Sequence, residues 1–585
     1  LPHDRHGDQD NTAIAPMNQQ HSQPLQHMQH PTARLALAAL TLLLAGCSGS
    51  APDVIFRGGP ILTVNGQNDV VQALAMRDGV ITAAGAEQEV LAQKDSHTQI
   101  VDLQGKTLLP GFVGAHEHPG ITAVFNGAIN LSGFQHKTNA EVWDTLRREV
   151  AKVPKGQWIY AGGLDAILTP DLKIPNRQAL DAIAPDNPLV LVSQTLHSFW
   201  ANSRAFEAAG ITRSTSDPGA GSYYERDPQG EFTGFVAETR AAQPFLKELK
   251  SPLKIYHRYV DVLDGLLANG FTSMASLGYN VPPLLARVAA SRNFSPRIRQ
   301  YFYLVEDELN YLPKAPDSSN PYFAVLGVKL WHDGSPYTGS MYTSVPYLDS
   351  PLGRTLGIQG GSHGSAMIPQ DSLTAKVRDY TAQGWQVAIH SQGDASNRAV
   401  LEAIANAGAL TGAAPTVRME HGVFLPAESV ARLAALGVSP SFHIHHIKYY
   451  GDALANSIVG LAAAQQTLPV RSAFAQGVQP TLHADSPMFP PQGFALMQTA
   501  MNRTTGLGLK LNAEESITAQ QALRAMTIHG AYQLRLQDKT GSLEVGKWAD
   551  LQVVDRNPYT TPVHELDRIR TLAVYVGGKP QYQAP

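Results

Sequence analysis

Cysteine is almost absent from this chain of 585 residues, which contains only Cys47. A disulfide framework and a metal site built from cysteine thiolates are therefore both excluded. Charged residues are also scarce, at 16% of the chain, and the formal net charge is −4. The chain contains no basic run of the kind that would indicate a nucleic-acid partner. Hydrophobic residues make up 43% of the chain, which is enough for a large core and excludes a wholly disordered protein.

Long apolar runs are missing as well, with one short exception near the start. Residues 1–27 are rich in Gln, His, Asp and Pro without apolar periodicity, so we interpret them as a disordered or non-native leader. Met28 offers a better start, and it is followed by Arg34 and the apolar run 35–44. This run is too short to span a bilayer as a permanent helix.

A basic residue, a short apolar run and small residues in this order predict a signal peptide over residues 28–46. The segment ends in Leu44-Ala45-Gly46-Cys47, which resembles a bacterial lipobox. The resemblance implies that Cys47 is lipidated and tethers the protein to the bacterial cell envelope, facing the periplasm or the surface. This anchor is the only membrane contact that we expect. A buried cysteine after an N-terminal helix is the alternative.

The two ends of the remaining chain share a β-rich pattern. Short strands are predicted over residues 54–56, 61–64, 73–77, 80–84, 551–554 and 572–576. Asp78-Gly79 has the composition of a hairpin turn between two of these strands. We therefore predict one small β-sandwich domain built from both termini, residues 47–105 and 536–585.

Strand and helix patterns alternate along the middle of the chain, residues 106–535. One helix is predicted over residues 372–382, with a strand over 385–389 after it. Another helix begins at Thr518, with Gln521 three residues later as a capping box. Such alternation predicts parallel strands covered by helices, so the fold class expected is α/β, a (β/α)₈ barrel.

The first strand of this barrel, predicted over residues 106–113, leads into His116-Glu117-His118. Residues two apart in an extended segment point to the same side, so both imidazoles can approach one metal ion while Glu117 points away. Alone, this pair is a weak signal, and two unrelated loop residues are the alternative. Four further polar residues end or follow predicted apolar strands: Lys329, His390, His421 and Asp485. Active sites of (β/α)₈ barrels lie at that end of the strands.

The spacing of these residues fits such a barrel, in which one βα unit takes about 30 residues. His421 follows His390 by 31 residues, or one unit, and Asp485 follows His421 by 64 residues, or two units. If His116 lies on strand 1, the other four fall on strands 4, 5, 6 and 8. His118 and Lys329 are 211 residues apart, which three units do not fill, so a large insertion is expected over about residues 125–260.

Each residue also has a purely structural interpretation. A lysine at a strand end is commonly exposed, the two later histidines could be satisfied core residues, and an aspartate there could cap a helix. The strand order makes the joint functional interpretation the stronger one.

Together these pieces resemble the amidohydrolase superfamily, and most of all the amidohydrolase-3 branch, which includes N-substituted formamide deformylases. The resemblance extends from about residue 53 to the end. The matching pieces are Pro110-Gly111-Phe112, His116-Glu117-His118, Val328-Lys329, Asp333-Gly334-Ser335, His390-Ser391-Gln392-Gly393-Asp394, Glu420-His421, Ala484-Asp485-Ser486-Pro487 and Gly541-Ser542-Leu543-Glu544-Val545-Gly546-Lys547. Two neighbourhoods depart from the usual pattern, Pro119-Gly120-Ile121 and Ser391-Gln392.

The resemblance implies a metal-dependent hydrolase that cleaves a non-peptide C–N bond, in an amide or formamide. His116, His118 and Asp485 would hold one divalent ion, expected to be zinc. His390 and His421 would hold a second, with Lys329, N6-carboxylated by CO₂, as the bridge. Asp485 would also move the proton from the attacking water to the leaving nitrogen. A mononuclear site with unmodified Lys329 is the alternative.

Substrate contacts are expected from four further residues: His197, Trp331, Tyr337 and His443. His197 lies in a segment similar to one that faces the pocket in this branch, and loop aromatics suit an apolar substrate. Simple packing of the loops is the alternative. The partner expected is a small molecule, with a homodimer left open. Competing functions are a deaminase or cyclic-amide hydrolase on the same scaffold, and a non-catalytic binding or regulatory surface lipoprotein.

Overall fold

The structure, a computed structural model, describes residues 51–585 except 220–221, 290, 293–294, 318 and 409–414. The predicted leader (1–27), the signal peptide (28–46) and the lipidation site Cys47 lie outside the described residues. Within the described part, no helix has both the length and the apolar character that crossing a bilayer requires.

Eight parallel strands form the central sheet, in the order β21-β20-β19-β18-β17-β16-β13-β6. Their bounds are β6 (Phe112–Glu117), β13 (Phe271–Leu277), β16 (Arg299–Leu304), β17 (Phe323–Trp331), β18 (Gln386–Ser391), β19 (Val417–His421), β20 (Ser439–Phe442) and β21 (Thr481–Leu482). The backbone N–H of His118 donates to the carbonyl of Ser486 with N···O 3.2 Å, next to the two end strands. The sheet is therefore a nearly closed barrel, and the predicted α/β barrel class is confirmed.

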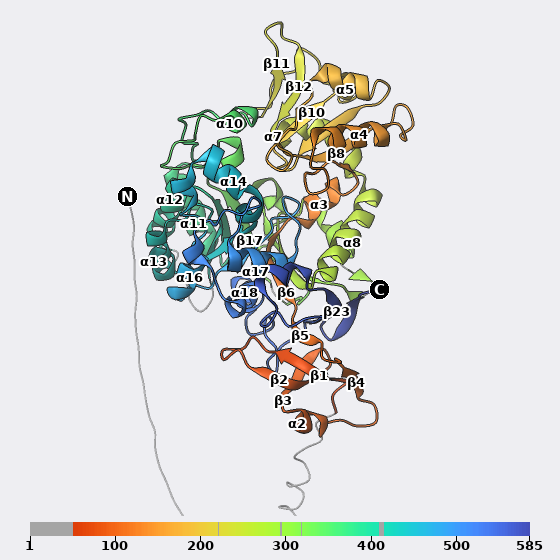
Figure 1. Cartoon of the computed structure of the whole chain (residues 1–585), viewed down its shortest axis with the longest axis vertical. Helices are drawn as coiled ribbons and strands as arrows, with labels where there is room; N and C mark the ends of the chain where they lie inside the picture. Colours follow the sequence, from red (N-terminus) through yellow and green to blue (C-terminus); the bar gives the residue numbers. More distant parts are fainter. Residues whose placement is uncertain (1–50, 220–221, 290, 293–294, 318, 409–414) are drawn as a thin grey trace, which may run out of the picture. The chain divides into compact units, whose positions relative to one another are not determined.

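Helices cover the outside of the barrel, and several of them lie along one side of β17 in Figure 1. They are α3 (Pro119–Phe125), α8 (Pro252–Ala268), α9 (Pro283–Ala289), α11 (Gln370–Ala382), α12 (Asp394–Asn406), α13 (Ala427–Leu436), α16 (Val470–Ala475), α17 (Gly493–Asn502), α18 (Ala519–Met526) and α19 (Ile528–Gln533). The helix predicted over 372–382 is confirmed as α11, which buries Leu373 and Val377 one turn apart. The predicted capping box of Thr518 and Gln521 is confirmed at the start of α18.

The strand numbers predicted from spacing are confirmed. Lys329 lies on β17, the fourth strand, and His390 lies on β18, the fifth. His421 ends β19, the sixth strand, and Asp485 follows β21, the eighth. Because the strands are parallel, all of their carboxyl ends meet at one mouth of the barrel.

The single strand predicted over residues 106–113 is wrong, because the structure has two strands there. β5 (Thr107–Pro110) belongs to another sheet, and β6 begins at Phe112. Gly111 separates them at a close approach, where a Cβ would lie 2.1 Å from Cγ2 of Thr272. The chain therefore turns from one sheet into the next at a position that only glycine fits.

A second eight-stranded sheet combines the two ends of the described chain, in the order β24-β23-β22-β5-β1-β2-β3 with β4 paired to β1. Besides β5, its strands are β1 (Val54–Leu62), β2 (Val70–Arg77), β3 (Val80–Gly85), β4 (Gln99–Asp102), β22 (Leu551–Val554), β23 (Thr571–Val576) and β24 (Lys579–Gln583). The predicted turn is present, with φ +51° at Asp78 and +77° at Gly79. The sandwich form of this domain stays a prediction.

The two strands predicted at 54–56 and 61–64 are instead one strand, β1, with a register shift between Arg57 and Ile61. Gly58 lies in this irregularity with φ +77°, and Gly59 approaches the carbonyl of Lys106 so closely that a Cβ would lie 2.1 Å from it. Gly58 and Gly59 therefore mark a β-bulge within one strand rather than a break between two strands.

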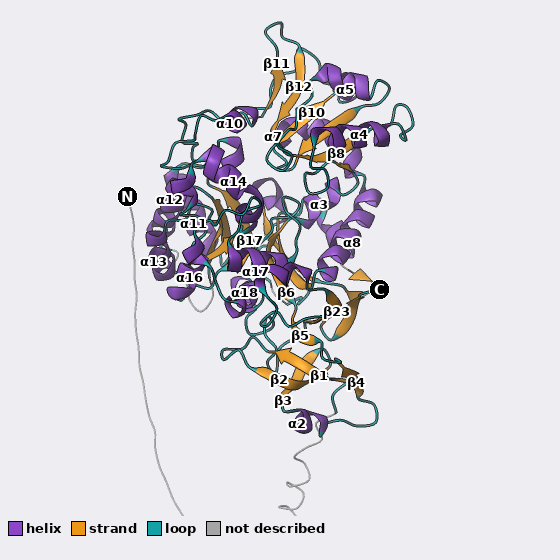
Figure 2. Cartoon of the chain, in the orientation of Figure 1, coloured by secondary structure: helices purple, strands orange, loops and turns teal. Residues whose placement is uncertain are grey.

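The segment between β6 and β13 forms a six-stranded sheet of its own, in the order β11-β12-β10-β9-β8-β7. Its strands are β7 (Ile129–Asn130), β8 (Ile159–Leu164), β9 (Leu189–Ser193), β10 (Ser198–Ala201), β11 (Tyr223–Arg226) and β12 (Phe232–Ala237). Figure 2 shows α4 (Asn139–Val150) and α5 (Arg177–Ile183) beside these strands. Leu146, Leu180 and Leu191 join them in a separate hydrophobic cluster. The insertion is thus a packed structure rather than a loop.

The remaining α-helices and strands of the described chain are short: α2 (Glu87–Leu91), α6 (Ser203–Ala208), α7 (Glu238–Ala242), α10 (Pro351–Thr355), α14 (Gly451–Ala453), α15 (Leu461–Ala464), β14 (Ser291–Arg292) and β15 (Ser295–Pro296).

Candidate metal centre

The carboxylate of Asp485 lies at the centre of a buried group of histidines at the barrel mouth. Its Oδ1 is 3.2 Å from Nε2 of His116 and 3.1 Å from Nε2 of His118. Its Oδ2 is 3.9 Å from Nδ1 of His421 and 3.8 Å from Nδ1 of His443. Three groups of residues each offer ligand atoms that all lie within 4.8 Å of one another. The groups are His116, His118 and Asp485; His421, His443 and Asp485; and His116, His421 and His483.

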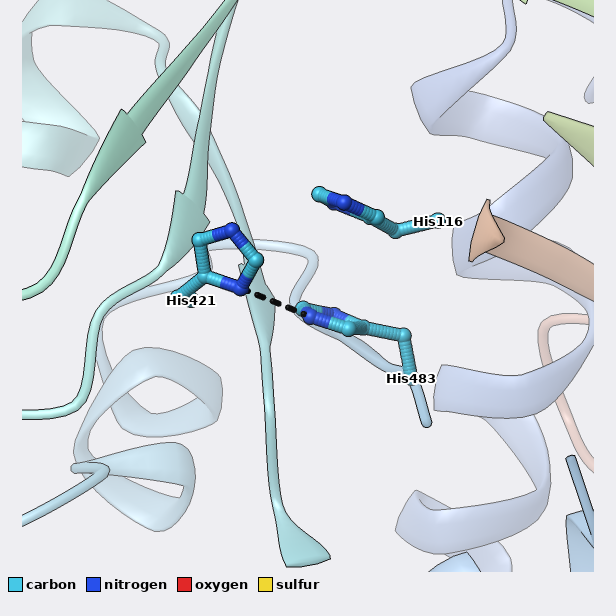
Figure 3. A group of neighbouring side chains, drawn as sticks. All are labelled: His116, His421 and His483. Atoms are coloured by element: carbon cyan, nitrogen blue, oxygen red, sulfur yellow. Dashed lines mark hydrogen bonds between the residues drawn. The ribbon is translucent and has the colours of Figure 1, made fainter. Parts of the chain in front are cut away.

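His483 is a member of this group that sequence reasoning missed. Its ring stacks on that of His116, with centroids 4.5 Å apart and planes 13° apart, and its Nε2 lies 3.2 Å from Nδ1 of His421 (Figure 3). His483 precedes Asp485 by two residues, so the alternation of an extended segment would have placed both on one side.

The protonation states of the group suit a metal ion. Burial lowers the pKa of five imidazoles, those of His118, His390, His421, His443 and His483. Burial alone would raise the pKa of Asp485, but His116, His118 and His421 hold it well below its ordinary value. Neutral imidazoles beside an ionised carboxylate are the forms that bind divalent metals.

Buried polar atoms without a partner also indicate a metal site. Nε2 of His116, Nζ of Lys329 and Oδ1 of Asp485 are buried, and none makes a well-directed hydrogen bond within the described part of the chain. Buried polar atoms are nearly always satisfied, so an ion is the simplest missing partner. The donor set of imidazole and carboxylate fits zinc and similar divalent ions.

A buried ion pair orients His116. Oε2 of Glu420 lies 2.6 Å from Nδ1 of His116, and Arg418 donates to both oxygens of Glu420 over 2.5 and 3.0 Å. Burial would raise the pKa of Glu420, but Arg418 and His116 hold it far below its ordinary value. The carboxylate therefore keeps the proton of His116 on Nδ1 and leaves Nε2 free to bind a metal. Sequence reasoning assigned no role to Glu420 or Arg418, although the two lie two residues apart on β19 and therefore point to the same side.

Lys329 is buried, with 1% of its surface exposed, so the alternative of an exposed strand-end lysine is wrong. Its Nζ lies 5.3 Å from the ring centre of Trp331. Burial lowers the pKa of Lys329 to about 8, so about a tenth of the amine is neutral at pH 7, far more than for an ordinary lysine.

His390 lies beside the central group rather than in one of its close sets. Its ring centre is 4.3 Å from that of His421, and its Nε2 is 3.8 Å from Oδ1 of Asp333. Asp333 accepts backbone N–H bonds from Gln392, Gly393 and Tyr342 over 2.9–3.1 Å. Burial raises the pKa of Asp333 to about 7.

A directed chain of hydrogen bonds ends next to Asp485. Nε2 of His443 donates to the carbonyl of Ala484 over 2.9 Å, so its Nδ1 accepts from Nε2 of His446, also 2.9 Å away. Nδ1 of His446 then accepts from the hydroxyl of Tyr337 over 2.6 Å. His443 is thus buried inside the barrel mouth, and its expected contact with the substrate stays a prediction.

Tyr337 and His197 line a cavity of about 550 Å³ between the insertion sheet and the loop after β17. Nδ1 of His197 lies 2.9 Å from Oε2 of Glu238. Burial lowers the pKa of His197, but Glu238 and the charge of Asp485 outweigh it and raise the pKa. Trp331 and His443, the other two expected substrate contacts, are not among the residues that line this cavity.

Comparison with known proteins gives consistent matches along the chain. The sequence profile described as "Amidohydrolase family" matches residues 99–582. An N-substituted formamide deformylase from Arthrobacter pascens is 27% identical, over 91% of this chain and 98% of its own length. The putative amidohydrolase YtcJ from Bacillus subtilis is 24% identical, over 90% of this chain and 99% of its own length.

The fold also matches that of a solved structure. An uncharacterized metal-dependent hydrolase from Pyrococcus horikoshii superimposes with a TM-score of 0.70, at 23% sequence identity, and covers 87% of this chain and 99% of its own. At this identity the likeness concerns the fold.

Proposed function

The chain belongs to the amidohydrolase family, and on that basis we propose that it is a metal-dependent hydrolase that cleaves an amide or formamide C–N bond of a small molecule. The observation that carries the proposal is the carboxylate of Asp485, which lies between His116 and His118 at the barrel mouth. A structural aspartate would not need a surrounding set of buried neutral imidazoles.

We propose that His116, His118 and Asp485 hold one divalent ion, with zinc expected, and that His390 and His421 hold a second. Bound ions would lower the pKa of a water molecule and polarise the substrate carbonyl. The unsatisfied Nε2 of His116 and Oδ1 of Asp485 support the first site. The short distance between the rings of His390 and His421 supports the second.

Lys329 would bridge the two sites as a carbamate. Its neutral amine would form an N–C bond to CO₂ and release one proton, which converts a weak ligand into two anionic oxygens. The burial of Lys329, the missing partner of its Nζ and its lowered pKa support this modification. A mononuclear site with unmodified Lys329 is the alternative.

Asp485 would carry the proton during catalysis. It would take the proton from the water that attacks the carbonyl carbon, as the C–O bond forms, and return it to the nitrogen as the C–N bond breaks. Glu420 would keep His116 in the tautomer that leaves Nε2 free. His443 would hold the backbone at Ala484, one residue before the catalytic carboxylate.

A substrate panel tests the proposed reaction. The metal-loaded protein is assayed with formamides, linear amides, cyclic imides and aminated nitrogen heterocycles, and with the Asp485→Asn variant as the control. Hydrolysis of a formamide or amide that the variant loses is the expected result. Ammonia release from heterocycles alone would indicate a deaminase. A metal-loaded protein without turnover in any arm would indicate a binding protein.

We also propose that the protein is anchored in the bacterial cell envelope by a lipid on Cys47, after removal of residues 28–46. The order of Arg34, the apolar run and the small residues before Cys47 supports this location. Cys47→Ala should release the protein from the membrane fraction. Membrane association of that variant at the level of the unaltered protein would contradict the anchor.

A further inference from the structure

The insertion sheet presents three aromatic rings to the cavity that contains His197. They are Trp200 on β10, Tyr223 on β11 and Phe235 on β12, three strands that are direct neighbours in the sheet. The ring centre of Phe235 lies 5.8 Å from that of Trp200 and 6.0 Å from that of Tyr223. None of the three is fully buried, and Tyr223 is 42% exposed. Aromatic faces left open in a cavity are available to a ligand.

Carboxylates lie beside these rings, and the cations that line the cavity are already paired. Arg354 forms an ion pair with Asp349, and His197 is paired with Glu238. Glu225 also lines the cavity, and no cation of the described chain pairs with it; its Oε2 accepts only from Oγ1 of Thr233, over 2.5 Å. The cavity therefore carries an excess of negative charge.

The charges of both glutamates converge on one ring. Burial raises the pKa of the Tyr223 phenol, and Glu225 and Glu238 raise it further. Tyr223 thus stays neutral and lies within the field of two carboxylates. An aromatic face combined with negative charge is the arrangement that attracts an organic cation, because the ring quadrupole and the carboxylates act in the same direction.

We propose that this cavity binds the cationic end of the substrate, an alkylammonium group, while the C–N bond to be cleaved lies at Asp485. The inference rests on the proposed function, since it names the class of amine that the hydrolase would release. Tyr337 connects the two regions, because it lines the cavity and its hydrogen bond to His446 begins the chain that ends at His443. Nδ1 of His443 lies 3.8 Å from Oδ2 of Asp485.

Two substrates of equal length test the proposal. N-formylcadaverine carries a free ammonium, and N-hexylformamide replaces that group with a methyl. The account predicts a higher kcat/KM for N-formylcadaverine, by roughly tenfold, chiefly through KM. The ratio should fall as salt is added, because screening weakens attraction at a half-exposed site. Equal rates for the two substrates, or a preference for N-hexylformamide, would overturn the cationic specificity and leave the hydrolase intact.

Substitutions in the cavity test whether the preference for N-formylcadaverine arises there. Glu225→Gln keeps the shape but removes the unpaired charge, and Trp200→Leu removes a ring but keeps the charge; each should lower the ratio about threefold or more. Glu231→Gln is the matched control, because Glu231 lies on the same hairpin but pairs with Arg213 and does not line the cavity. An unchanged ratio in both Glu225→Gln and Trp200→Leu would place the cation elsewhere and overturn the proposal.

A binding measurement separates this proposal from the proposed reaction. Calorimetry with cadaverine and the metal-free protein should show binding that Glu225→Gln weakens and Glu231→Gln does not. If neither formamide is hydrolysed but this binding is present, the cation cavity stands and the formamide reaction is wrong. Absence of binding, together with equal turnover of both substrates, would contradict the cation cavity alone.

Discussion

The candidate metal centre is built in the opposite way to the aromatic wall of the insertion cavity, which Trp200, Tyr223 and Phe235 form. At the centre, His116 is fully buried, and Glu420, which is itself held by two bonds from Arg418, fixes its orientation. At the wall, Tyr223 is 42% exposed, and Glu225 is exposed with one hydroxyl donor. The centre is therefore pre-organised, as the proposed chemistry at a carbonyl would require, whereas the wall is open, as the proposed binding of a cation would require.

This difference separates reaction from specificity. The proposed ligand set comes from the ends of five barrel strands, which parallel pairing brings together whatever the substrate is. The wall comes from three strands of the insertion sheet, β10, β11 and β12, a region that can change without moving the barrel. Substitutions at the centre should thus abolish turnover or destabilise the fold, and those at the wall should change KM.

The largest effect is expected at Asp485. Asp485→Asn keeps the size of the side chain but removes the base, because an amide does not accept a proton near neutral pH. We expect turnover to fall by about 10²–10⁴-fold, with the fold and at least one bound ion retained. Steady-state kinetics with metal analysis checks this, and near-full turnover of the variant would assign the base to another residue, with His197 and His443 the first to test.

The next effect concerns stability at the centre. Glu420→Gln leaves Arg418 as a buried charge without its carboxylate, a change that typically costs about 3–5 kcal/mol. The matched control is Asp144→Asn, which breaks an exposed pair with Arg147 and should cost under about 1 kcal/mol. Denaturant unfolding measures both. Equal losses in the two variants would show that the buried pair has no special role.

Asp333 should make the metal-free protein less stable as pH rises. Its pKa is raised by burial from 3.8 to about 7, so the unfolded chain gives up this proton more easily than the folded one. Its contribution to the free energy of unfolding is present below about pH 4 and is lost as pH rises through about 7, at about 1.4 kcal/mol for each pKa unit. Glu117, with a pKa raised to about 7 by burial, acts in the same direction.

Thermal unfolding between pH 4 and pH 8 in the presence of a chelator measures this slope. The Asp333→Asn variant, which does not titrate there, should show a flatter dependence than the unaltered protein. A slope that the substitution leaves unchanged would mean that Asp333 is ionised across the whole range.

The smallest effect is expected at Tyr337, which lines the insertion cavity and also donates to His446 in the hydrogen-bond chain toward Asp485. Tyr337→Phe removes the donor to His446 and leaves its buried Nδ1 unsatisfied, which should cost about 1–3 kcal/mol of stability. Turnover should fall by less than in Asp485→Asn, because the chain from Tyr337 acts through the backbone at Ala484. A loss of turnover equal to that in Asp485→Asn would place Tyr337 among the groups that contact the substrate.

Sequence alone predicted the barrel and the strands of its polar residues, because strand alternation and the length of a βα unit are local and regular. It missed His483 and the pair of Arg418 and Glu420, whose roles depend on which strands become neighbours. Sequence reasoning predicted one strand where β5 and β6 are separate, because the close approach of Gly111 to Thr272 is a contact between distant segments. The substrate contact expected of Trp331 stays a prediction; its ring centre lies 5.3 Å from Nζ of Lys329.

The measurement that tests the central claim most directly is the metal content of the purified protein. Without chelator during purification, we expect about two divalent ions per chain, and a marked loss in Lys329→Ala that an added small carboxylic acid partly reverses. His116→Asn should lose metal as well, whereas the wall variant Glu225→Gln should keep it. A protein without metal, which neither zinc nor manganese activates, would contradict the account.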